Sequence, residues 1–284
     1  MIKQKQFNYS IVVFLLAFGL LYWNTIYEMV MEWYIDPNYS HGFLIPFISG
    51  YLLWQKKENL GSVVINPTNL GLIIVVIGLC VYLVGNVTGD PFTIRISILI
   101  VIAGTILFTC GIRLFKEVSF PFFYLIFMIP LPFILYDSLA FPLKLLVSKY
   151  SVGFLKLIGI PALREGNIIY LVNTTLHVAD ACSGIRSIIS LLALSTVLAS
   201  FTQRDLIKKM ILVALAVPIA VFVNCIRVIG TGILAIKYGE EVAEGFYHQF
   251  AGIGVFGIAM GILILAALIL GKIRVKKDMG KGSN

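Results

Sequence analysis

The sequence has 284 residues, of which 59% are hydrophobic and only 13% are charged. Average soluble domains carry about 25% charged residues, so a chain this apolar must be solvated largely by lipid. The net charge of +8 raises the possibility of nucleic-acid binding, but the basic residues lie in short clusters between apolar runs, as in the loops of membrane proteins. We therefore predict an all-α polytopic membrane protein that does not bind nucleic acid.

Eight apolar runs are candidate transmembrane helices, because a helix needs about 20 mostly apolar residues to cross a bilayer. In chain order they cover residues 8–30, 41–55, 69–86, 93–112, 118–136, 184–203, 208–228 and 248–271. The first follows a basic start typical of a signal peptide, but its apolar run is long and lacks a small-residue cleavage site. We therefore expect it to be retained as an anchor, and we expect the short second run to need flanking residues to span.

The Lys and Arg residues between these runs predict the orientation of the chain. Alternate loops divide the 22 basic residues into 14 on the side that holds both termini and 8 on the other side. Cytoplasmic loops carry the excess of Lys and Arg, so both termini are expected in the cytoplasm. No linker or internal repeat divides the sequence, and residues 1–284 are expected to form a single membrane-embedded domain.

The stretch between the fifth and sixth runs is not predicted to contain a further span. Residues 137–159 are apolar but include lysines at positions 144, 149 and 156. An amphipathic helix in the outer interface fits them better than a ninth span, which would invert every later element. Residues 167–180 then carry β-branched and aromatic residues on both sides of Asn173-Thr174 and predict a short β-hairpin.

Polar residues gather where three consecutive spans reach the outer face. They are Asp180-Ala181-Cys182-Ser183-Gly184-Ile185-Arg186 before the sixth span, Asn224-Cys225-Ile226-Arg227 at the end of the seventh and His248 at the start of the eighth. Charged groups at this depth are costly to place in lipid and are usually functional when they face other helices. The three spans are thus expected to deliver a thiol, a guanidinium and an imidazole to the outer face.

These groups suit covalent catalysis by a cysteine. Cys182 would stand at a helix N-terminus, where unpaired N–H groups, the helix dipole and a neighbouring arginine all favour a thiolate. His248 could act as general base and then as acid, and Arg227 could hold the oxyanion of a tetrahedral intermediate. Each type also has a structural role in other membrane proteins: a cysteine fills a small space, an arginine reaches the interface and a histidine caps a helix.

Two sets of motifs give the sequence its resemblance to a known family. The run from Ala181 to Ser187, followed by Asn224-x-x-Arg227 and then His248, resembles the exosortases of the exosortase/archaeosortase family. The earlier Tyr39-Ser40-His41-Gly42, followed by Leu52-x-Trp54, is similar to the same family. The resemblance extends from about residue 33 to residue 248. One departure is Asp180, where the family pattern leads us to expect a glutamate two residues before the cysteine.

The resemblance implies a membrane-embedded cysteine transpeptidase or protease that needs no cofactor. Its substrate would be an exported protein whose C-terminal tail joins a recognition motif (Pro-Glu-Pro in the bacterial branch), a hydrophobic helix and a basic end. Cys182 would be the nucleophile, and Arg227 and His248 would complete the site. Archaeosortases are expected to carry arginine in place of this histidine, so His248 favours the bacterial branch and a site at the outer face of the cytoplasmic membrane. An acceptor nucleophile of unknown identity, or water, would resolve the acyl-enzyme.

Further residues are expected to support the site or to bind substrate. Arg186 follows Cys182 by one helical turn and shares its face, and it could pair with an acidic motif, as could Arg164 or the lysines of residues 137–159. The residues expected in this supporting role are Asp180, Ser183, Gly184, Arg186, Asn224 and His41. Helix capping is the alternative role for Asp180 and Asn224, and a structural hydrogen bond is the alternative for His41. His177 is a second candidate for the general base.

Two other classes of function remain open at this stage. A transporter or carrier of an anionic, possibly saccharide-linked substrate would use the same cations, and prolines in the fifth and seventh spans would suit it. A thiol-redox protein would pair Cys182 with Cys225, although helical geometry turns residue 225 about 200° away from residue 227. No His, Cys or carboxylate set has metal spacing and no glycine-rich nucleotide motif is present, so we expect no metal and no cofactor.

Overall fold

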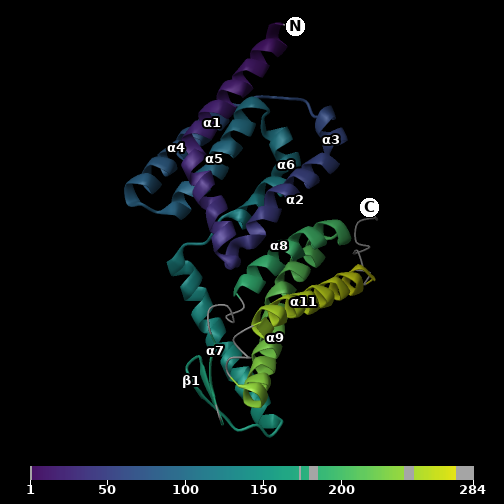
Figure 1. Cartoon of the computed structure of the whole chain (residues 1–284). Helices are drawn as coiled ribbons and strands as arrows, with labels where there is room; N and C mark the ends of the chain where they lie inside the picture. The colour runs from purple at the N-terminus through teal and green to yellow at the C-terminus, as the bar shows by residue number, and fades with distance from the viewer. Residues whose placement is uncertain (1, 173, 179–184, 240–245, 273–284) are drawn as a thin grey trace, which may run out of the picture. The chain divides into compact units, whose positions relative to one another are not determined.

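The computed structural model describes residues 2–172, 174–178, 185–239 and 246–272, which Figure 1 traces. The chain divides into two compact units, Met1–Phe133 and Ile134–Asn284. Helices account for almost all of the regular structure, and the described part of the chain adds one three-stranded sheet. The predicted all-α polytopic class is therefore confirmed.

The first unit is built from three long helices and several short elements. The long helices are α1 (Ile2–Ile35), α4 (Leu70–Thr88) and α5 (Pro91–Thr109); the others are η1 (Pro37–Phe43), α2 (Leu44–Gln55), α3 (Lys57–Ser62), α6 (Ile112–Tyr124) and η2 (Leu125–Met128). Only two residues join α4 to α5. Gly89 ends α4 with a left-handed φ of 66°, and the Asp90 carboxylate accepts the Thr93 N–H at 3.0 Å to begin α5.

Glycines allow α4 and α5 to approach each other closely. Gly71, Gly78 and Gly85 recur every seven residues along α4 and are buried against α5. A Cβ added at Gly71 would lie 2.1 Å from the backbone nitrogen of Phe108, and one added at Gly104 would lie 2.6 Å from the backbone nitrogen of Val75. Small residues at such contacts let two membrane helices pack backbone to backbone.

We expect Gly71→Ala to destabilise the first unit by about 1–3 kcal/mol, because the added methyl group overpacks a contact made by backbone atoms. Thermal unfolding of the purified protein in detergent, followed by helical circular dichroism, measures the effect. Gly50→Ala in α2 is the matched control, because nothing lies within 4 Å of its Cβ position. Equal unfolding temperatures for the two variants would contradict the close contact.

Buried polar contacts join α1 to α5 within the first unit. Arg95 is only 6% exposed, and its Nη2 lies 2.6 Å from the carboxylate of Glu32. The Tyr22 and Ser97 hydroxyl groups are hydrogen-bonded at 2.8 Å on the same pair of helices. These contacts satisfy polar groups that lipid could not hydrate.

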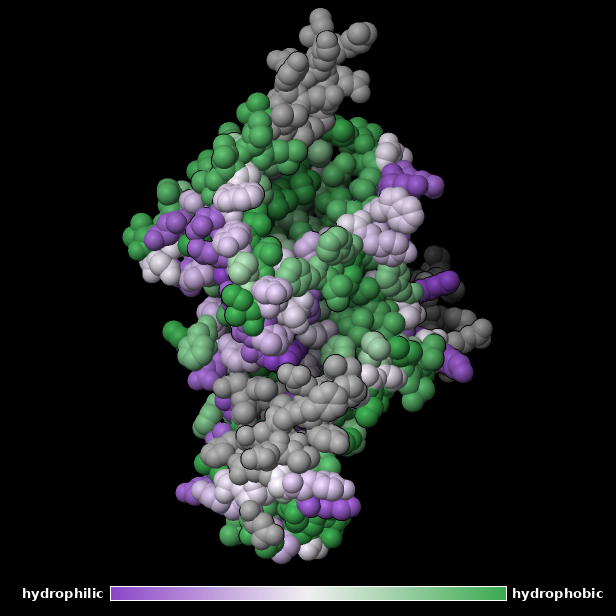
Figure 2. All heavy atoms as spheres, viewed as in Figure 1, coloured by the Kyte–Doolittle hydropathy of each residue, from purple (hydrophilic) through white to green (hydrophobic). Residues whose placement is uncertain are grey.

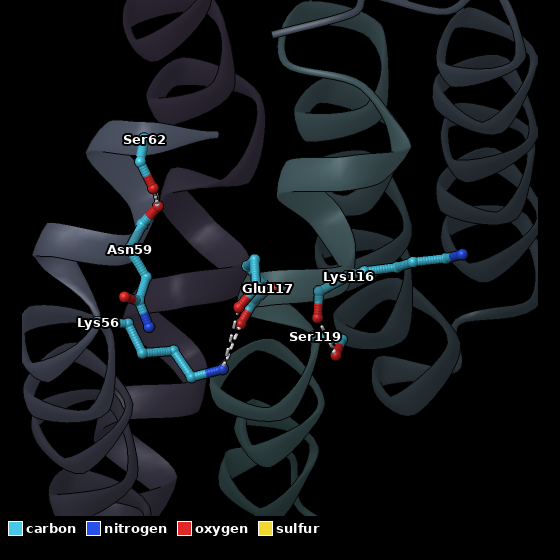
Figure 3. A network of polar contacts seen from close by, with 6 residues as sticks. All are labelled: Lys56, Asn59, Ser62, Lys116, Glu117 and Ser119. Carbon is cyan, nitrogen blue, oxygen red and sulfur yellow. Dashed lines mark hydrogen bonds and ion pairs between the residues drawn. The ribbon is translucent and has the colours of Figure 1, made fainter. Parts of the chain in front are cut away.

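The fifth predicted span, residues 118–136, is broken by its prolines. Pro121 lies inside α6, and residues 129–132, which include Pro130 and Pro132, separate η2 from the next helix. Because proline has no N–H, the carbonyl of Glu117 loses its usual helical donor. Lys56 Nζ donates to this carbonyl at 2.7 Å and lies 3.8 Å from the Glu117 carboxylate, so that it links the end of α2 to α6 (Figure 3).

The described residues of the second unit form four helices and the sheet. Its elements are α7 (Phe133–Leu157), β1 (Ala162–Glu165), β2 (Ile168–Leu171), β3 (Thr175–His177), α8 (Ile185–Thr202), α9 (Leu206–Tyr238) and α11 (Phe246–Lys272). The sheet is antiparallel in the order β1-β2-β3. The predicted hairpin is present as β2 and β3, while β1 adds a strand that we did not predict. Its signal was Gly166-Asn167, a two-residue hairpin turn in which Gly166 has a φ of 60°.

Two hydrophobic clusters hold the second unit together. The first joins α8, α9 and α11 through Leu191, Leu212, Ala216, Ala220, Val223, Ala259 and Leu263. The second joins α7, the sheet and α9 through Val147, Leu155, Ile169, Val178 and Val228. Because the second cluster buries the far part of α9, this helix continues to Tyr238 and does not end near residue 228 as predicted. Its 33 residues extend over about 50 Å, which exceeds the thickness of the hydrocarbon core.

The described residues contain six helices that are long and apolar enough to cross a membrane. A seventh span results if α6–η2 and α7, which are separated by a short break, are counted as one. We expected about eight. The difference arises because α2 has only 12 residues and because the proline-rich break joins the fifth predicted span to the segment predicted to lie in the interface. Hydrophobic residues cover much of the surface in Figure 2, as lipid-facing helices require.

Candidate active site

The geometry of the second unit brings one end of three helices together. A short connection, residues 203–205, makes α8 and α9 antiparallel, and Ile188 near the start of α8 packs with Val223. At the opposite end of this bundle, Gln203 Nε2 donates to the Ala267 carbonyl at 2.7 Å, which places the end of α11 beside the start of α9. The first turns of α8 and α11 therefore lie at the same end as residues 223–227 of α9 (Figure 1).

Arg227 is half-buried on α9 and lies against α11. A Cβ added at Gly252 would lie 3.7 Å from Arg227 Nη2 and 3.8 Å from its Cζ. The missing side chain of Gly252 thus leaves space for the guanidinium group. His248 precedes Gly252 by one helical turn, so the two positions share a face of α11. The backbone of α11 accordingly presents position 248 on the side that faces α9.

Asn224 and Cys225 precede Arg227 on α9 and have different surroundings. Asn224 is 2% exposed and lies one turn before Arg227 on a similar face. Cys225 packs against the α7 and sheet cluster, and its carbonyl accepts the Ser151 hydroxyl at 3.5 Å. Because Arg227 lies against α11 whereas Cys225 packs with the α7 cluster, the two side chains do not share one environment.

Two other residues of the predicted site are described. Arg186 is half-buried at the start of α8, directly after the buried Ile185. His41 lies in η1 of the first unit with its Nδ1 atom buried. Burial lowers the pKa of His41, while backbone hydrogen bonds with Phe127 and Asn38 raise it in part.

The remaining predicted site residues lie outside the described part of the structure. They are Asp180, Cys182, Ser183 and Gly184, together with the side chains of His248 and His177. Their proposed roles therefore remain predictions. Among the described residues, no group of three or more His, Cys, Asp or Glu side chains could hold a metal ion.

The burial of Lys144 was not evident from the sequence. The sequence predicts an amphipathic helix over residues 137–159 with all three lysines alike, but in α7 Lys144 is 9% exposed while Lys149 and Lys156 are exposed. The sequence signal for this burial was periodicity, because small or apolar residues lie three, four and seven positions from Lys144, on the same face of a helix. These residues are Ala140, Val147, Ser148 and Ser151, all of them buried.

We expect Gly252→Leu to lower the rate of substrate processing by about tenfold to a hundredfold, because the new side chain would displace the Arg227 guanidinium. Gly252→Ala should retain most activity, since its Cβ would make ordinary van der Waals contact. Gly257→Leu on the same helix is the control, because its Cβ position is open. Processing is measured at matched membrane levels of each variant, and equal activity of Gly252→Leu and Gly257→Leu would contradict this geometry.

Comparison with known proteins supports the resemblance seen in the motifs. The transmembrane exosortase family matches residues 33–265, a range that includes His41, Cys182, Arg227 and His248. The chain is 30% identical over 162 residues to a probable archaeosortase E of Methanocaldococcus jannaschii, which covers 57% of this chain and 80% of that protein. No solved structure matches the chain. The chain therefore belongs to the transmembrane exosortase family, whose members are membrane protein-sorting transpeptidases of the cysteine class.

Proposed function

We propose that this protein cleaves the C-terminal sorting tail of exported proteins through an acyl-enzyme on Cys182. The observation that carries the proposal is the convergence of α8, α9 and α11 beside Arg227, inside the region that matches the exosortase family. The half-buried guanidinium lies beside α11, one turn from position 248, and the described part of α8 begins three residues after Cys182. This arrangement suits a nucleophile, an oxyanion-binding cation and a proton carrier.

The proposed reaction has two steps. In the first, the Cys182 thiol transfers its proton to His248, and the sulfur attacks the scissile carbonyl carbon. Arg227 stabilises the oxyanion of the tetrahedral intermediate, which collapses to a thioester while His248 protonates the leaving amine. In the second, an acceptor amine or water attacks the thioester, His248 takes its proton, the Cys182 sulfur departs, and His248 returns the proton to it so that the thiol is restored. Asp180 and Asn224 would orient the charged groups.

The substrate we propose has a tail with three parts: a recognition motif of the Pro-Glu-Pro type, a hydrophobic helix and a basic end. A basic end in the cytoplasm would hold the motif at the outer face of the membrane. Many apolar side chains of α9 and α11 are exposed, among them Phe222, Ile226 and Leu265. A hydrophobic tail can therefore reach the enzyme by lateral diffusion in the bilayer. We place the protein in a bacterial cytoplasmic membrane with both termini inside.

The proposal is tested by co-expressing the chain with an exported reporter that carries such a tail from a protein of the same genome. Loss of the tail is followed by mass spectrometry of the reporter. We expect the wild type to remove the tail, and to fail when the hydrophobic helix or the recognition motif is deleted. If the reporter stayed intact with every such tail that the genome encodes, the proposal would be contradicted. An anion carrier or a thiol-redox protein would then be the better hypothesis.

A further inference from the structure

Strand β3 lies at one edge of the sheet in the second unit. The strand order is β1-β2-β3, so β3 pairs with β2 on one side, and no described strand pairs with its other side. Exposed strand edges present unpaired N–H and C=O groups and are usually blunted by a lysine, a proline or a β-bulge. The residues of β3, Thr175-Leu176-His177, include neither lysine nor proline and pair with β2 in continuous register. The edge is therefore suited to accept another strand.

The hydrogen bonds of the sheet show which backbone groups of β3 point to this open edge. The Val178 N–H donates to the Asn167 carbonyl at 3.0 Å, and the Leu171 N–H donates to the Thr174 carbonyl at 2.8 Å. In an antiparallel pair, residues alternate between those bonded to the partner strand and those whose N–H and C=O point away from it. The positions bonded to β2 are therefore 174, 176 and 178, and the backbone groups of positions 175 and 177 point to the open edge.

The sheet packs along α7 and α9 so that the two ends of β3 lie at different levels of α9. Near the start of β3, a Cβ added at Gly232 would lie 3.6 Å from Leu171 Cδ1 and 3.8 Å from Leu155 Cδ1. Gly232 follows Arg227 on α9 by more than one helical turn. Because Leu171 is bonded to Thr174, β3 begins beyond the candidate active site, toward the C-terminal end of α9.

The end of β3 lies nearer to the candidate active site. The turn between β1 and β2 is next to this end in the register, and its Gly166 carbonyl accepts the Ser148 hydroxyl at 3.0 Å. Ser151, about one turn further along α7, donates to the Cys225 carbonyl at 3.5 Å. β3 therefore runs toward the site, and the chain that continues it reaches Cys182 five residues after position 177.

We propose that the open edge of β3 binds the recognition segment of the exported substrate as an added β-strand. Main-chain hydrogen bonds to positions 175 and 177 hold this segment extended and lead its scissile bond toward Cys182. A motif of the Pro-Glu-Pro type suits such an edge. Prolines two residues apart turn both of their missing N–H groups away from β3, while the residue between them faces β3. This inference rests on the proposed function and adds how the enzyme recognises its substrate.

The first test removes a donor from the edge. Thr175→Pro deletes the outward N–H without deleting a hydrogen bond of the sheet, because a strand tolerates proline where the N–H points away from its partner. Val172→Pro is the matched control, since Val172 is exposed in the turn between β2 and β3 and has a negative φ. Cleavage of a synthetic Pro-Glu-Pro tail peptide is measured in detergent micelles. We expect Thr175→Pro to raise KM about tenfold with little change in kcat, and Val172→Pro to stay within about twofold of the wild type.

The second test changes only the peptide and uses the wild-type enzyme, so it decides the matter if Thr175→Pro does not accumulate in the membrane. N-methylation of the residue between the two prolines removes the N–H that faces β3. We expect this change to raise KM about tenfold or more. N-methylation of the second residue before the motif is the control, because that residue has the opposite alternation and its N–H points away from β3. The control peptide should keep KM within about twofold of the unmodified peptide.

Three outcomes would contradict the inference. Equal KM values of Thr175→Pro and the wild type, or equal effects of the two N-methyl groups, would overturn it while leaving the proposed function intact. If the edge paired with a second copy of the chain, Thr175→Pro would change the oligomeric state and leave KM unchanged, which also overturns it. A wild type that does not cleave the unmodified peptide would overturn the proposed function as well, so the two failures are distinguishable.

Discussion

Cys182→Ala is expected to abolish tail removal, to below about one thousandth of the wild-type rate, because the proposed acyl-enzyme forms on the Cys182 thiol. Cys225→Ser should leave the rate within about twofold. Cys225 packs with Val147 and Val228 on the α7 side of α9, whereas Arg227 lies against α11. The measurement is the fraction of co-expressed reporter that loses its tail, at matched levels of each variant.

The pair of cysteine variants also separates the competing functions. A thiol-redox protein that uses both cysteines would lose activity equally in Cys182→Ala and Cys225→Ser. An anion carrier would tolerate both changes, since its substrate is bound by cations. Only the transpeptidase hypothesis predicts complete loss in the first variant and near-normal processing in the second. Processing that survives in Cys182→Ala would contradict the proposed mechanism.

Arg227→Gln is expected to lower processing by about a hundredfold to a thousandfold, the usual cost of removing an oxyanion donor. Arg227→Lys should recover only part of this loss, because an ammonium group lacks the planar fork of donors. The control is Arg204→Gln, since Arg204 is exposed in the connection between α8 and α9 at the opposite end of the bundle. Rates are measured on the purified enzyme and a synthetic tail peptide in detergent micelles.

A second readout distinguishes a chemical role of Arg227 from a structural one. If its charge favours the Cys182 thiolate, iodoacetamide should inactivate the wild type at lower pH than Arg227→Gln. A variant that had only lost packing would be inactivated over the same pH range as the wild type. An unchanged pH profile would therefore show that the charge of Arg227 does not favour the Cys182 thiolate, while an unchanged rate would exclude Arg227 from catalysis.

Several features of the fold could be predicted because each depends on residues close together in sequence. Apolar runs predicted membrane helices, and β-branched residues predicted the strands of the hairpin. The number of membrane spans was predicted less accurately. The prolines at 121, 130 and 132 were placed in the fifth predicted span, but the sequence did not show where the helices on either side of this break end and begin.

The candidate site shows the same division. The order and types of Cys182, Arg227 and His248 and the resemblance to exosortases were available from the chain alone. The sequence did not reveal that Gly252 leaves room for the Arg227 guanidinium, because that contact joins helices separated in the chain. Nor did the sequence show that Lys144 is buried while Lys149 and Lys156 are exposed, since all three were predicted to lie in one interfacial helix.

By itself, then, the sequence determined that this chain is a polytopic membrane protein and which motifs carry its chemistry, because hydropathy and residue type are local properties. Only the tertiary structure decided which faces of the helices meet. It extended α9 to Tyr238 against the α7 and sheet cluster, turned Cys225 toward that cluster, set Arg227 against α11 and buried Lys144. The physical reason is that burial depends on the partner helix, and a partner distant in sequence leaves no local pattern.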